Sequence, residues 1–126
     1  MSYVSPGRAS APQGALWLVL AAGLMGAAGV ALAAVAAHRL ESPALATAAM
    51  MLMVHAAAVL ALAGISLAVE QGRSWRGVAA LMLSSVALFS GDVAVHAITG
   101  SHLFPYAAPT GGSLTILSWV LVALAA

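Results

Sequence analysis

One stretch of this sequence places ionisable residues inside an apolar run: Leu88-Phe89-Ser90-Gly91-Asp92-Val93-Ala94-Val95-His96. The run covers residues 77–99, which at about 1.5 Å per residue is long enough to cross a bilayer. Asp92 and His96 are four positions apart, so they share one face if the run is helical. An ionisable pair at membrane depth is costly and indicates a functional site by default.

The composition of the whole chain predicts a lipid environment. Of 126 residues, 63% are hydrophobic and 6% are charged, and the mean hydropathy is +1.08. A soluble domain carries about 25% charged residues, so this chain has too few to keep a water-facing surface soluble. With a net charge of +1, the chain has no strongly basic surface that would attract nucleic acid, so no nucleic-acid partner is expected. The absence of cysteine excludes disulfides, thiolate catalysis and cysteine-ligated metals.

Four apolar runs predict four membrane-spanning helices in a single domain at residues 14–126, after a flexible polar tail at residues 1–13. Pro43 suits the first turn of the second helix, where its missing N–H is not needed. The predicted fold class is therefore all-α, an integral membrane four-helix bundle. Its predicted spans lie approximately at residues 15–37, 44–69, 77–99 and 109–126.

Basic residues predict the orientation of the bundle. Arg8, Arg73 and Arg76 fall on one side of a four-span arrangement, and Arg39 falls on the other. Because basic residues favour the cytoplasmic side, both termini are expected in the cytoplasm, in a bacterial cytoplasmic (inner) membrane. Two tryptophans are expected at this cytoplasmic interface as part of an aromatic belt: Trp17 and Trp75.

The first span carries a line of small residues. Gly29, Ala33 and Ala37 recur at a spacing of four, which lets another helix backbone approach closely. This line predicts either an internal contact of the bundle or a docking groove for another protein. Helix four near Trp119 is a second candidate for docking.

Five polar residues within or beside the spans form a candidate intramembrane constellation: His38, His55, Ser90, Asp92 and His96. Such a column could relay protons, bind a metal, or ligate haem through two histidines. Alternatively, these residues hydrogen-bond across helices and fix their packing. No His-x-x-x-His motif occurs, so neither a metal nor another cofactor is predicted. Asp92 is expected to face the interior and to bond His55, His96 or a serine.

The chain resembles the small inner-membrane proteins of the domain of unknown function 423 family, which includes YgdD-like and transmembrane protein 256-like members. The pieces that carry the resemblance stand in order over residues 15–126: 32–38, His55, 88–91, 109–112 and Trp119. Asp92 stands where that family usually has serine, and His96 has no counterpart there. The resemblance implies a four-helix membrane protein without an established activity.

Two functions are compatible with this sequence. The first is a non-catalytic accessory subunit or stabiliser of a larger membrane complex, with membrane lipid as its surroundings. The second is a small proton-linked transporter or channel-like protein that uses His55, Asp92 and His96. No nucleophile elbow, phosphate-binding loop or paired carboxylates occur, so no enzymatic activity is predicted.

Overall fold

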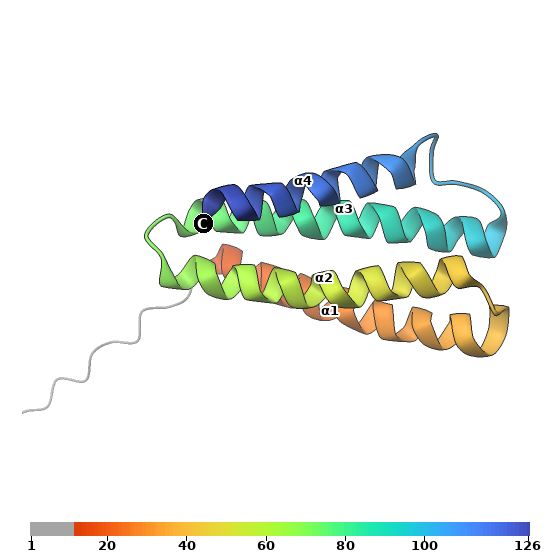
Figure 1. Ribbon diagram of the computed structural model, residues 1–126. Helices are drawn as coiled ribbons and strands as arrows, with labels where there is room; N and C mark the ends of the chain where they lie inside the picture. Colours follow the sequence, from red (N-terminus) through yellow and green to blue (C-terminus); the bar gives the residue numbers. More distant parts are fainter. Residues whose placement is uncertain (1–11) are drawn as a thin grey trace, which may run out of the picture.

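The computed structural model describes residues 12–126 and contains four long antiparallel helices in this part of the chain, without strands (Figure 1). The predicted all-α four-helix fold is therefore confirmed. A short π-helical turn, η1, follows the first helix. The elements are α1 (Gln13–Val35), η1 (Ala36–Leu40), α2 (Pro43–Ala68), α3 (Gly72–Thr99) and α4 (Ala107–Ala125).

All four helices are long and apolar enough to cross a membrane. The shortest is α4, whose 19 residues span about 28 Å at 1.5 Å per residue, close to the thickness of the hydrocarbon core. The structure differs from the predicted spans mainly at helix starts. Helix α3 begins at Gly72 instead of residue 77, and α4 begins at Ala107 instead of residue 109. Residues 1–11 of the predicted tail lie outside the described part of the chain. Gln13, which was also predicted in the tail, is the first residue of α1.

Each helix packs against its neighbour in sequence, so the bundle consists of two helical hairpins laid side by side (Figure 1). The α2–α3 turn and the C-terminus lie at one end, and η1 and the α3–α4 loop lie at the other (Figure 1). Helices α1 and α4 do not pack against each other. The core is centred on α2 and α3, where Val59, Met82 and Val86 are fully buried.

Local sequence signals fix two of the helix ends. The hydroxyl of Ser42 accepts a hydrogen bond from the N–H of Leu45 at 3.3 Å, and Pro43 occupies the first position of α2 as predicted. Helix α3 ends at Gly100, which adopts φ 75° and donates its N–H to the carbonyl of His96. The chain can therefore reverse over the last turn of α3.

The small-residue line of α1 is partly used inside the bundle. Gly29 is buried against α2, where a Cβ atom would lie 2.7 Å from Cγ of Met53 and 3.1 Å from the carbonyl oxygen of Ala49. Ala33 is half-buried and Ala37 is exposed. The internal contact therefore holds at Gly29, whereas docking of another protein on the rest of the line stays a prediction.

The two tryptophans near the α2–α3 end have different surroundings. Trp17 is exposed on α1, as expected for an aromatic belt. Trp75 is 9% exposed and belongs to the hydrophobic core, so its predicted place in the belt was wrong. Because α3 begins before Trp75, this side chain is carried on a helical face that packs into the bundle.

Candidate functional site

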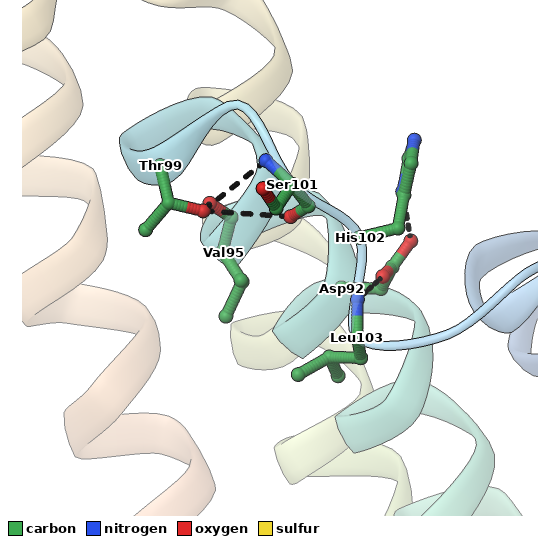
Figure 2. A network of polar contacts seen from close by, with 6 residues as sticks. All are labelled: Asp92, Val95, Thr99, Ser101, His102 and Leu103. Carbon is green, nitrogen blue, oxygen red and sulfur yellow. Dashed lines mark hydrogen bonds and ion pairs between the residues drawn. The ribbon is translucent and has the colours of Figure 1, made fainter.

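A buried carboxylate near the end of α3 organises the polar residues at this end of the bundle. Asp92 is fully buried (0% exposed), in agreement with its expected inward orientation. One carboxylate oxygen accepts a hydrogen bond from Nδ1 of His102 at 2.8 Å, and the other accepts one from the N–H of Leu103 at 2.7 Å (Figure 2). Asp92 thus ties the α3–α4 loop to the side of α3.

The start of α4 adds to the stabilisation of this carboxylate. The backbone amide of Ala108, in the first turn of α4, also faces Asp92. A helix N-terminus carries a partial positive charge and unpaired N–H groups, which favour a negative charge beside it. Asp92 therefore joins α3 to the loop, beside the first turn of α4.

The predicted hydrogen-bond partners of Asp92 were wrong. None of His55, His96 or a serine bonds this carboxylate, and its partners come from the loop. Helical spacing indicated only which residues share a face of α3, whereas His102 reaches Asp92 after the chain reverses. The signal that could have indicated this reversal is Gly100, a typical helix-ending residue two positions before His102.

His96 joins the Asp92 cluster through His102. The two imidazole rings are stacked, with centroids 4.0 Å apart and planes 6° from parallel. Because Nδ1 of His102 faces the carboxylate, its Nε2 points away from Asp92 (Figure 2), and 54% of the side chain is exposed. The cluster therefore combines a buried anion with two imidazoles that face the surroundings. Parallel rings do not converge on a common metal position, and residues 12–126 contain no group of three ligands that could hold one.

His55 forms a second polar site near the middle of the bundle. Its Nδ1 lies 2.8 Å from the carbonyl oxygen of Met51, and its Nε2 accepts a hydrogen bond from Nε1 of Trp119 at 3.2 Å. An indole N–H can only donate, so Nε2 is unprotonated and Nδ1 carries the proton. Both nitrogens of a neutral imidazole are thus occupied, which leaves no lone pair for a haem iron.

The candidate constellation is consequently divided into separate parts. His38 is exposed at the α1–α2 turn, whereas His55 bonds Met51 and Trp119. Asp92 and His96 belong to the cluster with His102. Ser90 is buried, and its hydroxyl has no hydrogen-bond partner among the described residues. No hydrogen bond of the described chain connects these parts into a column.

This fold and these buried polar contacts define a small integral membrane protein of four helices. The family model described as "Protein of unknown function (DUF423)" matches residues 32–112 of the chain. The chain therefore belongs to this family, and the resemblance inferred from the sequence is confirmed. No curated protein and no solved structure matches the chain.

Proposed function

We propose that the protein is a non-catalytic accessory subunit of a larger membrane complex, which it contacts through α4 around Trp119. The observation that carries this proposal is the pairing of Trp119 with His55. His55 is 5% exposed and accepts a hydrogen bond from the indole N–H of Trp119. Trp119 itself remains 46% exposed on the outer side of the bundle. An aromatic side chain held in one orientation before binding is a favourable anchor for a partner.

The surroundings of Trp119 also suit contact with another membrane protein. The outward face of α4 contains no charged residue, and the helix is long and apolar enough to cross a membrane. A partner there gains affinity from packing and from the amphipathic indole, not from ion pairs. The exposed large residues of this face are Ile116, Leu117, Trp119, Val120 and Leu124.

The proton-linked alternative has less support. Proton transfer through the bundle needs polar groups in hydrogen-bonded succession, and His55 and Asp92 belong to separate clusters. A proton on Nε2 of His55 would also face the indole N–H of Trp119, so it would break the bond between them. The described polar contacts therefore favour a structural use of these residues.

Replacing Trp119 with alanine should release the protein from its complex. We expect the wild-type protein to migrate with a larger assembly in native gels after extraction in a mild detergent, and Trp119→Ala to migrate alone. Leu60→Ala is the control, because Leu60 is exposed on α2 and lies outside the proposed docking face of α4. If the wild-type protein migrates alone, or if both variants behave alike, docking at Trp119 is wrong.

We further propose an inner-membrane location with both termini in the cytoplasm. Arg73 and Arg76 lie at the α2–α3 end, whereas Arg39 lies in η1 at the opposite end. Three of the four arginines then face the cytoplasm if Arg8, which lies outside the described residues, follows the same side.

Single cysteines test this orientation, since the chain has none of its own. In whole cells, an impermeant maleimide should label Ser42→Cys and Ser101→Cys and leave Ser74→Cys unlabelled until the membrane is opened. Labelling of Ser74→Cys from outside, with Ser42→Cys protected, would reverse the proposed topology.

A further inference from the structure

A groove runs between α1 and α3 from the α2–α3 end of the bundle. Helix α1 packs closely along α2 and touches α3 much less, so the described helices leave this space open. Two hollows of about 520 and 460 Å³ lie in it. Both are lined by Ala21 of α1 and Leu83 of α3, so the two hollows are continuous. The groove therefore leads from the end of the bundle into its membrane-spanning part.

Two arginines line the mouth of this groove, next to the α2–α3 turn. Arg73 and Arg76 are three residues apart on α3, so they share one face of the helix, and both line the hollow nearer the turn. Arg76 is half-buried and its side chain crosses to α1, since a Cβ atom added at Gly14 would lie 3.4 Å from its Cδ and 3.5 Å from its Nε. Trp17 lines the mouth on the α1 side and is exposed, and an indole ring favours the level of the lipid headgroups.

No acidic side chain of the sequence forms a salt bridge with these arginines. All three acidic residues lie in the described part of the chain: Glu41, Glu70 and Asp92. The only salt bridge within residues 12–126 joins Asp92 to His102. Glu70, which precedes α3 at the same end as the arginines, lines a separate hollow. The mouth of the groove thus carries two positive charges that an external anion would complement.

Beyond the arginines the walls of the groove are apolar. Apart from Ser90, all the side chains that line it, over residues 18–32 of α1 and 77–94 of α3, are apolar. The 11 residues from Arg76 to Ala87 rise about 16 Å along α3, which is about half of the roughly 30 Å hydrocarbon core and so the depth of one leaflet. The groove therefore presents cationic groups at the level of the headgroups and apolar walls at the level of the acyl chains.

We infer that this groove binds one anionic phospholipid from the adjoining leaflet. The site is here named the arginine groove, and its principal residues are Trp17, Ala21, Arg73, Arg76 and Leu83. The two guanidinium groups bind the headgroup phosphate, because a guanidinium presents paired N–H donors that match the oxygens of a phosphate. An acyl chain of the same lipid lies along the apolar walls between α1 and α3.

Charge and polarity together select this occupant. An apolar helix of another protein would cover the walls and leave both arginines without an anion, whereas a free phosphate would leave the apolar part of the groove empty. A zwitterionic lipid carries its own ammonium group beside the phosphate, so it gains less from two guanidinium groups. Basic pockets between membrane helices are a known means of binding anionic headgroups, which are abundant in the cytoplasmic leaflet.

The arginine groove does not depend on the proposed function, because it uses α1 and α3 and the accessory role uses α4. Failure of docking at Trp119 therefore leaves the lipid site intact, and loss of lipid binding leaves the docking proposal intact.

Native mass spectrometry in a mild detergent measures lipid binding directly, and the orientation of the protein in the membrane plays no part there. We expect the wild-type protein to bind its first phosphatidylglycerol at least tenfold more tightly than phosphatidylcholine with the same acyl chains. Arg73→Gln/Arg76→Gln should lose this preference. Arg39→Gln is the matched control and should keep it, because Arg39 is exposed at the opposite end of the bundle.

Three results would overturn the inference. Equal binding of the two lipids by the wild type would show that the arginines select no headgroup, and an equal loss in the Arg39→Gln control would show that any arginine serves. Displacement of phosphatidylglycerol by inorganic phosphate would show that the arginines bind a free anion only. Arg73→Lys/Arg76→Lys keeps both positive charges and should keep the preference, so a loss as complete as in the glutamine variant would show that charge does not select the lipid.

A filling substitution tests whether an acyl chain occupies the groove. Ala80→Phe places a ring in the hollow that the arginines line and leaves both charges in place, so it should weaken phosphatidylglycerol binding at least tenfold. Ala57→Phe is the matched control on the exposed side of α2 and should bind as the wild type does. If Ala80→Phe also binds as the wild type does, the lipid is held by surface charge alone and the groove is not its site.

Discussion

Gly111→Ala is expected to destabilise the bundle by about 3 kcal/mol, at the upper end of the usual cost of overpacking. An added Cβ atom would lie 2.6 Å from the backbone nitrogen of Phe89 and 2.7 Å from the carbonyl oxygen of Ser85. These are backbone atoms of α3 and do not move aside as a flexible side chain would. Helix α4 would have to shift away from α3, which would also strain the 3.0 Å hydrogen bond between the hydroxyls of Thr115 and Ser85.

Gly112→Ala is the matched control for this effect. Its added Cβ atom would meet only ring atoms of Phe89, the nearest at 3.6 Å, which is ordinary contact. Since alanine has the higher helix propensity, this variant should be as stable as the wild type or more stable by up to about 1 kcal/mol. Thermal unfolding in detergent, followed by circular dichroism, measures both variants. Equal unfolding temperatures for Gly111→Ala and Gly112→Ala would show that α4 does not approach α3 so closely.

Asp92→Leu is expected to release the α3–α4 loop and to cost about 3 kcal/mol. The substitution removes the acceptors of two donors, Nδ1 of His102 and the N–H of Leu103. A buried donor left without a partner costs about 1–3 kcal/mol, although His102 can turn toward water because it is partly exposed. Asp92→Asn keeps one acceptor oxygen and nearly the same shape, so it should lose about half as much.

Limited proteolysis in the loop and thermal unfolding measure these effects together. We expect cleavage between Gly100 and Tyr106 to be fastest in Asp92→Leu, intermediate in Asp92→Asn and slowest in the wild type. His102→Ala should resemble Asp92→Asn, since it removes one of the two bonds and leaves the amide of Leu103 in place. If Asp92→Leu were as resistant as the wild type, the loop would not depend on Asp92.

The sequence by itself determined the number and type of the elements. Few charges and four long apolar runs leave membrane-spanning helices as the way to satisfy the backbone in lipid. Pro43 marked the start of α2, because its chemistry acts within one turn of the chain. The family could also be inferred, since ordered residues along the chain carry it.

Only the tertiary structure decided which polar and small residues meet. Asp92 was singled out on its helix, but its partner His102 is reached through a loop whose path helical periodicity does not specify. The sequence left His55 open between a polar column and hydrogen bonds across helices, and only the return of α4 along α3 shows that it bonds Trp119. Gly23 and Gly29 both lie on α1, yet Gly29 is covered by α2, whereas a Cβ atom added at Gly23 would meet nothing within 4 Å. Spacing along one helix defines a face, whereas the packing of the other helices decides whether that face is covered.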